Sequence, residues 1–180
     1  MSPEKYDELY SIDSAISPGT GKTTTLLEAM KQLLDRDKNC RILACAPSNS
    51  AADLIAEKMM YLGTNALFRL NSFARPVDLL LQKKEMLKPY CLINDNTVFA
   101  VPPLEVLRAY RLVVSTCVSG GIPSGLGFAR GHFTHIFIDE AGQATEPEAM
   151  VRIEIVMLRC EAECQFGRFR SRLWRTIRQI

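Results

Sequence analysis

The 180-residue sequence predicts an α/β fold in which a mostly parallel sheet is covered by helices on both faces. Two observations favour this class. Short apolar runs alternate with segments of helical periodicity, and polar motifs follow three of those runs directly. Strands separated by helices form βαβ units, whose strands run parallel. Because such sheets bind ligands at the carboxyl ends of their strands, the polar motifs mark the candidate site.

The first expected element is an amphipathic helix that begins near Lys22. Its apolar positions recur at helical spacing: Leu26, Leu27, Met30, Leu33 and Leu34. A buried strand follows at 41–46 (RILACA), where the apolar run ends at Pro47. A second helix then ends at Gly63. Its apolar face is expected to carry Leu54, Ile55, Met59 and Leu62.

Three further strands are expected from apolar runs, and the last two of them are rich in β-branched and aromatic residues. They are 66–70 (ALFRL), 111–116 (RLVVST) and 133–139 (FTHIFID). Between 71 and 105 the pattern weakens, which predicts an insertion of helices and loops. The glycine-rich stretch 119–127 (SGGIPSGLG) predicts a flexible loop on the side of the site.

Charge is distributed unevenly along the chain. Segment 152–180 contains seven Arg against three Glu, hence +4, which leaves −2 for residues 1–151 out of an overall +2. The basic character therefore belongs to the C-terminal segment and gives little evidence that the main part binds polyanions. We interpret this arginine run as a solvated face rather than a nucleic-acid-binding arm, the alternative interpretation.

The sequence shows no membrane-spanning run and no signal peptide. Its six cysteines are scattered rather than arranged as a disulfide framework, so they are expected to be reduced thiols of a cytosolic or nuclear protein. With only two histidines in the chain, a metal site built from Cys and His is not expected.

Residues 18–24 (PGTGKTT) carry the pattern of a phosphate-binding loop. Gly19 and Gly21 allow the backbone N–H groups to turn toward phosphate oxygens. Lys22 is expected to reach the β- and γ-phosphates, and the Thr23 hydroxyl to ligate Mg²⁺. The helix that follows directs its positive end toward the same anion. The alternative is a chance glycine-rich turn before a helix.

The loop departs from the usual pattern at its first glycine, where the chain has Ile16. A β-branched side chain costs roughly 1–3 kcal/mol wherever the backbone requires a positive φ. This substitution predicts that ATP affinity is weakened.

The second motif, IFIDEAGQ at 136–143, places acidic residues at the end of an apolar strand. Asp139 is suited to hold Mg²⁺ opposite Thr23. Glu140 is placed to act as general base on the attacking water, and Gln143 to sense the γ-phosphate. Taken alone, a strand that ends in an acidic turn would explain the same residues.

The third motif, APSNSAAD at 46–53, permits two explanations. Ser48, Asn49 and Ser50 would cap the second helix. The same side chains at a helix N-terminus are suited to bind a nucleic-acid backbone. Sequence alone does not choose between these roles, and Thr116 likewise could simply end a strand.

Four stretches together resemble the first motor domain of superfamily 1 RNA helicases. They are PGTGKTTTLLEAM, ILACAPSNSAAD, RLVVST and RGHFTHIFIDEAGQATEPEAM. The likeness is to the Armitage-like group, which includes the plant silencing-defective RNA helicases. It covers residues 17–151, with 71–105 as an insertion within that domain.

The resemblance implies a RecA-like P-loop NTPase fold, use of ATP and Mg²⁺, and single-stranded RNA as the polymer. It also implies RNA-silencing proteins as partners, a role in RNA silencing or RNA turnover, and a cytoplasmic location. The implied ATP-binding residues are Pro18, Gly19, Thr20, Gly21, Lys22, Thr23 and Thr24. The implied catalytic residues are Lys22, Asp139, Glu140 and Gln143, with Thr23 and Asp139 as the Mg²⁺ ligands. The implied RNA path carries Ser48, Asn49, Ser50 and Thr116.

The two ends of the chain differ from the family pattern. Segment 1–16 lacks the expected apolar strand, and segment 152–180 lacks the family's next motif. The sequence therefore predicts a motor domain incomplete at both ends, without a second RecA-like domain and with weak autonomous activity. The alternatives are a non-catalytic nucleotide- or RNA-binding module and a non-functional truncation product.

Overall fold

The computed structural model describes residues 21–95, 97–129 and 131–139. The helices are α1 (Lys22–Arg36), α2 (Asn49–Lys58), α3 (Val77–Lys84), α4 (Leu104–Ala109) and α5 (Ile122–Gly125). The 3₁₀ turns are η1 (Met60–Leu62), η2 (Glu85–Tyr90) and η3 (Ser119–Gly121). The strands are β1 (Ile42–Ala46), β2 (Leu67–Arg69), β3 (Leu92–Asn94), β4 (Val98–Ala100), β5 (Leu112–Thr116) and β6 (His135–Ile138).

The main sheet is parallel and has the strand order β2-β5-β1-β6. Its central strand β1 pairs Ala46 with Thr116 of β5 and Cys45 with Ile138 of β6. The strands predicted at 41–46, 66–70, 111–116 and 133–139 are all present. The predicted α/β class with a parallel sheet is confirmed.

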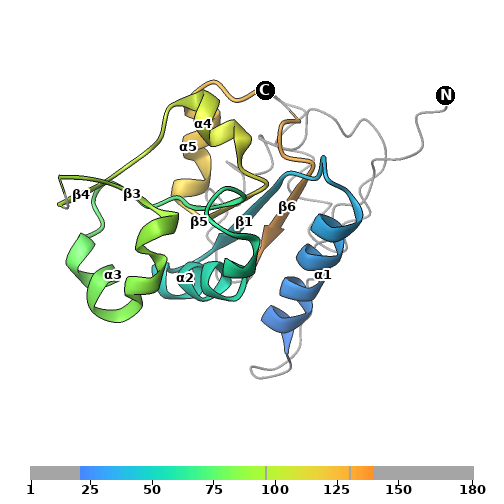
Figure 1. Cartoon of the computed structure of the whole chain (residues 1–180), viewed down its shortest axis with the longest axis horizontal. Helices are drawn as coiled ribbons and strands as arrows, with labels where there is room; N and C mark the ends of the chain where they lie inside the picture. The colour runs from blue at the N-terminus through green and yellow to red at the C-terminus, as the bar shows by residue number, and fades with distance from the viewer. Residues whose placement is uncertain (1–20, 96, 130, 140–180) are drawn as a thin grey trace, which may run out of the picture.

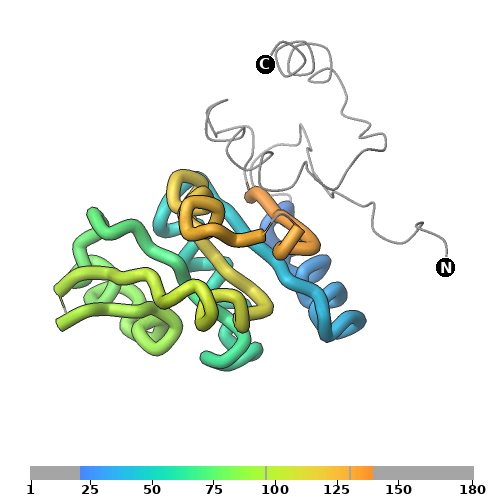
Figure 2. The backbone as a smooth tube through the Cα atoms, turned by 90° about the horizontal axis from the view of Figure 1, so that it is seen from above, coloured from blue at the N-terminus to red at the C-terminus, as the bar shows by residue number. Residues whose placement is uncertain are grey.

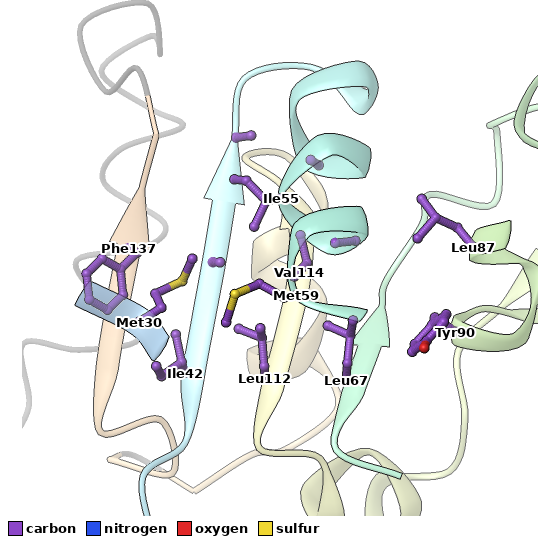
Figure 3. Close-up of a cluster of buried hydrophobic side chains, with 14 of the residues drawn as sticks. Met30, Ile42, Ile55, Met59, Leu67, Leu87, Tyr90, Leu112, Val114 and Phe137 are labelled. Atoms are coloured by element: carbon purple, nitrogen blue, oxygen red, sulfur yellow. The ribbon is translucent and has the colours of Figure 1, made fainter. Parts of the chain in front are cut away.

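Side chains of the main sheet alternate between two apolar clusters, as the two-residue period of a strand requires. In β1, Ile42 and Ala44 pack with α1 and α2, whereas Leu43 and Cys45 pack in the cluster that contains Leu107 of α4. Helices therefore cover both faces, as predicted. Figure 3 shows the first cluster running across all four strands, from Phe137 at β6 to Leu67 at β2.

Helix α1 buries Leu26, Met30 and Leu34, which recur every four residues along one face. Figure 3 shows Met30 close to Phe137 of β6. This packing fixes α1 beside β6, the strand that leads into the acidic motif. The predicted helix after the phosphate loop is confirmed.

The second helix is shorter and oriented differently from the prediction. Helix α2 ends at Lys58, and the chain continues as η1 up to Gly63, where φ is 79°. Leu54 was predicted on the inner face, but 41% of it is exposed. The buried positions are Ala52, Asp53, Ile55 and Ala56. The small Ala52 and Ala56 let the helix pack closely on the sheet, which turns Leu54 outward.

The segment between 71 and 105 contains α3, η2 and the start of α4, together with an antiparallel hairpin that the sequence did not predict. In this hairpin, Ile93 of β3 pairs with Phe99 of β4, and Phe99 is buried in the first cluster. Figure 1 and Figure 2 show the hairpin and α3 at one end of the described part, with α1 at the other.

The prediction of a flexible loop at 119–127 is wrong. Residues 119–125 form η3 and α5, a turn follows at 126–127, and Ser119 donates its backbone N–H to Thr116 Oγ1 at 3.2 Å. Gly120 is needed for close packing, because a Cβ there would lie 2.9 Å from Cys45 Sγ. Pro123 lies near the start of α5, where its fixed φ suits a helix.

Other expectations concern residue chemistry. The four cysteines within the described residues, Cys40, Cys45, Cys91 and Cys117, form no disulfide with one another. Within the same residues no group of His, Cys, Asp and Glu is arranged to hold a metal ion. None of the described helices has the length and apolar character to cross a bilayer. Segments 1–16 and 152–180 lie outside the described residues.

Candidate nucleotide and RNA site

The candidate site lies along one edge of the sheet, where neighbouring parallel strands end. Thr116 is the last residue of β5, Ser48 follows β1 by two residues, and Asp139 follows β6 directly. Because β1 lies between β5 and β6, Ser48 stands between the positions of Thr116 and Asp139. The three polar motifs therefore meet at a single edge of the sheet.

Thr23 and Asp139 meet at this edge across 116 positions of sequence. Thr23 Oγ1 donates a hydrogen bond to Asp139 Oδ2 at 3.0 Å. Asp139 is only 6% exposed, and its backbone N–H donates to Cys45 O at 2.9 Å. That backbone bond continues the ladder between β6 and β1, so the sheet fixes the carboxylate beside the first turn of α1.

The N-terminus of α1 has features that suit an anion. Gly21 precedes the helix with a φ of 84°, in the left-handed region that glycine adopts without strain. Within the described residues no side chain caps this N-terminus, and its first turn holds no acidic residue. The first N–H groups of a helix lack partners inside it, so they are available to a phosphate group. Lys22 is half-buried and Thr24 exposed in the same turn.

These residues fit a nucleotide bound with Mg²⁺. A hydroxyl and a carboxylate whose oxygens lie 3.0 Å apart present the hard oxygen ligands that Mg²⁺ prefers. Thr23 and Asp139 would hold the ion, and Lys22 with the N–H groups of the first turn would hold phosphate oxygens. Bound Mg²⁺ would neutralise charge on the phosphates.

Helix α1 is also held at its other end. Arg111, which precedes β5, donates from Nη2 to Leu34 O at 2.6 Å and to Asp37 O at 2.7 Å. A guanidinium at a helix C-terminus satisfies carbonyls that lack partners and complements the negative end of the helix dipole. The helix that carries Lys22 and Thr23 is thus anchored to the sheet at both ends.

In contrast with α1, the N-terminus of α2 is capped by its own side chain. Ser48 Oγ accepts a hydrogen bond from Ala51 N at 3.2 Å and lies 3.0 Å from Ser50 Oγ. The capping role predicted for Ser48 is confirmed, whereas Asn49 and Ser50 belong to the first turn. Ser48, Asn49 and Ser50 are nevertheless all exposed, so their polar groups are accessible to a ligand.

Thr116 ends β5 and organises the turn that follows. Its Oγ1 lies 3.1 Å from Ser119 Oγ and accepts the Ser119 backbone N–H. Thr116 is half-buried, and Ser119 is 3% exposed. These contacts support the interpretation that Thr116 ends strand β5 and shapes the turn after it. A contact with RNA would be a second role of the same side chain.

A buried ionic network below Asn49 was not predicted. Arg69 of β2 donates from Nε to Asp53 Oδ1 at 2.9 Å and from Nη2 to Asn49 Oδ1 at 3.1 Å. Arg75 binds the same carboxylate, with Nη1 2.9 Å from Asp53 Oδ1 and Nη2 2.5 Å from Oδ2. The side chains of Arg69, Arg75 and Asp53 are 0%, 7% and 5% exposed.

The sequence held one signal for this network. Arg69 interrupts the apolar run ALFRL, and an arginine in a buried strand requires a partner. Burial lowers the pKa of Arg69, and the charge of Asp53 opposes that shift. Two guanidinium groups share one carboxylate, so the network carries one excess positive charge below the N-terminal half of α2.

Part of the predicted site cannot be placed. Pro18, Gly19 and Thr20 of the loop, and Glu140 and Gln143 of the acidic motif, lie outside the described residues. The structure therefore brings together Gly21, Lys22, Thr23 and Asp139 at one position, and Ser48, Asn49 and Thr116 along the neighbouring strands.

Comparisons with known proteins agree with this architecture. A family model described as an AAA domain matches residues 14–76. The human "RNA helicase Mov10l1" is 37% identical over 142 residues, which cover 77% of this chain. The Drosophila melanogaster "Probable RNA helicase armi" is 38% identical over 162 residues, which cover 78% of this chain. The chain spans only 11% and 13% of the lengths of these two relatives.

The matches and the parallel sheet with its phosphate-loop helix support the same assignment. Through its matched part, the chain belongs to the Armitage-like group of superfamily 1 RNA helicases and has the α/β architecture of their first RecA-like domain.

Proposed function

We propose that this chain is an ATP-dependent RNA helicase-type motor domain that couples ATP binding and hydrolysis to the binding of single-stranded RNA. The observation that carries this proposal is the 3.0 Å contact between Thr23 Oγ1 and Asp139 Oδ2 beside the uncapped N-terminus of α1. Phosphoryl transfer depends on positioning and charge stabilisation, which an oxygen pair and a helix N-terminus supply.

In this proposal Lys22 and the first turn of α1 bind the phosphates, with residues 18–21 completing the loop. Thr23 and Asp139 orient Mg²⁺, Glu140 accepts a proton from the attacking water, and Gln143 senses the γ-phosphate. Glu140 and Gln143 are assigned from the motif alone, because they lie outside the described residues.

We assign RNA to the carboxyl ends of the neighbouring strands β1 and β5. Ser48, Asn49 and Ser50 present exposed polar groups at the N-terminus of α2, and Thr116 ends the neighbouring strand. Contacts of this kind position a phosphate backbone without reading its sequence. The backbone N–H of Asp139, at the ATP position, donates to Cys45 of β1, the strand that leads to Ser48, which allows occupation of one position to influence the other. The names of the relatives support RNA as the polymer that the domain binds. We assign the domain to RNA silencing or RNA turnover in the cytoplasm, and we propose RNA-silencing proteins as its partners.

The test is ATP hydrolysis by the purified chain, measured with and without single-stranded RNA. We expect a slow rate that RNA stimulates and that Lys22→Ala abolishes. Lys31→Ala, which changes an exposed lysine of the same helix, is the matched control and should retain the rate. Equal background rates for the unaltered chain and Lys22→Ala would refute autonomous catalysis, and retained RNA binding would then indicate a non-catalytic binding module.

A further inference from the structure

Asn49 is exposed at the N-terminus of α2, yet a buried residue holds its side chain. Arg69 Nη2 donates to Asn49 Oδ1 at 3.1 Å, and Arg69 itself is fully buried. A guanidinium group only donates hydrogen bonds, so the Asn49 atom that faces it must be the oxygen. This contact leaves the two N–H bonds of Nδ2 as the donors that Asn49 offers to a ligand.

We propose that Arg69 is a positioning residue for RNA binding, which acts through Asn49 by fixing its amide so that Nδ2 donates to an acceptor oxygen of the RNA backbone. This inference rests on the proposed RNA contact of Asn49.

The surroundings of Arg69 fix it in the orientation that this role requires. Its Nε binds Asp53 Oδ1 at 2.9 Å, and its Nη1 binds Leu70 O at 2.5 Å. Each part of the guanidinium group therefore has an acceptor, and only Nη2 reaches the surface residue. An arginine fork held by two acceptors besides Asn49 cannot rotate freely, so it restricts the rotamer of Asn49 before RNA arrives.

The charge of the network suits an anionic partner. Asp53 neutralises one of the two guanidinium groups, and Arg75 contributes the second from the segment that follows β2. The resulting positive charge lies under the same helix N-terminus that presents Asn49, where the helix dipole has the same sign. Both contributions favour a phosphate oxygen over a neutral acceptor.

A double-mutant cycle on RNA affinity tests the inference. The probe is a fluorescein-labelled single-stranded oligouridylate titrated with the full chain and followed by anisotropy. Asn49→Ala should weaken binding about 3- to 10-fold, the value of one net hydrogen bond. Arg69→Lys keeps a charge beside Asp53 but lacks the fork, and should weaken binding by a similar factor. In the Asn49→Ala background, Arg69→Lys should have no further effect beyond about twofold.

Arg111→Lys is the matched control, because Arg111 binds Leu34 O and Asp37 O before β5, at the end of the sheet opposite to Asn49. It should lower the unfolding temperature and leave RNA affinity unchanged within about twofold. Asn49→Asp supplies a test that leaves Arg69 intact. Its carboxylate can still accept from Arg69 but offers no donor, so RNA binding should weaken at least as much as in Asn49→Ala.

The outcomes separate the inference from the proposed function. If Asn49→Ala weakens RNA binding but Arg69→Lys does not, or acts equally in both backgrounds, the role of Arg69 is wrong and the RNA contact stands. Binding by Asn49→Asp at the unaltered affinity would also overturn the inference. If Asn49→Ala itself binds RNA normally, the proposed RNA contact is wrong and the role of Arg69 fails with it.

Discussion

Thr23 Oγ1 donates a hydrogen bond to Asp139 Oδ2 at 3.0 Å, although 116 positions separate the two residues in the sequence. Thr23 lies in the first turn of α1 and Asp139 directly follows β6, so the packing of α1 beside the parallel sheet brings them together. The two oxygens lie beside helix N–H groups that no described side chain caps. This relationship is the basis for assigning Mg²⁺ and ATP to the site.

If Thr23 is a Mg²⁺ ligand, its hydroxyl rather than its shape is essential. Thr23→Val keeps the branched side chain but removes the oxygen. It should weaken Mg²⁺-dependent ATP binding about tenfold or more, because a contact to a charged group is worth roughly 1.5–3 kcal/mol. Thr23→Ser keeps the oxygen and should bind nearly as the unaltered chain. Titration of ATP at several Mg²⁺ concentrations distinguishes the two variants. Equal Mg²⁺ dependence in both would remove Thr23 from the metal site.

Arg111 should stabilise the fold by holding the C-terminal end of α1. Arg111→Met removes two hydrogen bonds to the carbonyls of Leu34 and Asp37, and we expect it to lower the free energy of unfolding by about 1–3 kcal/mol. Arg108→Met is the control, because Arg108 makes only weak, exposed contacts in the described part of the chain, a 3.2 Å hydrogen bond to Gly127 O and a guanidinium 5.7 Å from the centroid of the Phe128 ring. Urea unfolding followed by circular dichroism measures both. A larger loss for the Arg108 variant would contradict the anchoring role.

Gly120 should tolerate no side chain. A Cβ at this position would lie 2.9 Å from Cys45 Sγ and 3.3 Å from Ser115 Oγ, and both residues are fully buried in the central strands. Gly120→Ala should therefore destabilise the fold by about 1–3 kcal/mol through overpacking. Gly125→Ala, five residues further along the chain in α5, meets no atom within 4 Å and should be neutral or slightly stabilising. Thermal unfolding of the two variants gives the comparison, and equal unfolding temperatures would rule out the close packing.

His132 should make stability depend on pH. Burial, with further contributions from Arg41 and Arg108, lowers the pKa of His132 below its ordinary value of 6.5. The unfolded chain therefore takes up a proton near pH 6.5 while the folded chain resists it. Stability should fall as the pH decreases through 6.5, and should level off below the lowered pKa.

His132→Gln removes the titrating group and should flatten this slope. Phe128→Leu removes an aromatic neighbour, whose ring centroid lies 4.6 Å from that of His132, but retains the imidazole. It should lower stability at every pH and keep the slope. Urea unfolding between pH 5 and pH 8 measures the difference, and an unchanged slope in His132→Gln would contradict the assignment.

The sequence predicted the parts of the fold that depend on local pattern. Apolar runs such as 41–46 become buried strands because both faces of a parallel sheet are covered. The same reasoning placed Asp139 and Thr116 at strand ends on one edge. The hairpin at 92–100 was missed, because its strands are three residues each and the alternation of apolar residues is short.

Packing rather than pattern decided the remaining features. The glycine-rich stretch 119–127 predicts a flexible loop, whereas in the structure Gly120 allows a helical turn to approach Cys45. The contacts of Arg69 with Asp53 and Asn49 join residues 16 and 20 positions apart through the packing of α2 on β2. The position of Arg69 in an apolar run indicated that it needed a partner but not which one.

The most direct test is equilibrium binding of a fluorescent ATP analogue to the purified chain, in Mg²⁺ and in excess chelator. We predict saturable binding in Mg²⁺ that is strongly reduced by chelator, by Lys22→Ala and by Asp139→Asn, and is retained by Lys31→Ala. The Ile16 position at the start of the loop predicts that this affinity is weak. Absence of saturable binding by the unaltered chain, or equal affinity in Lys22→Ala, would contradict the assignment of an ATP site to Thr23 and Asp139.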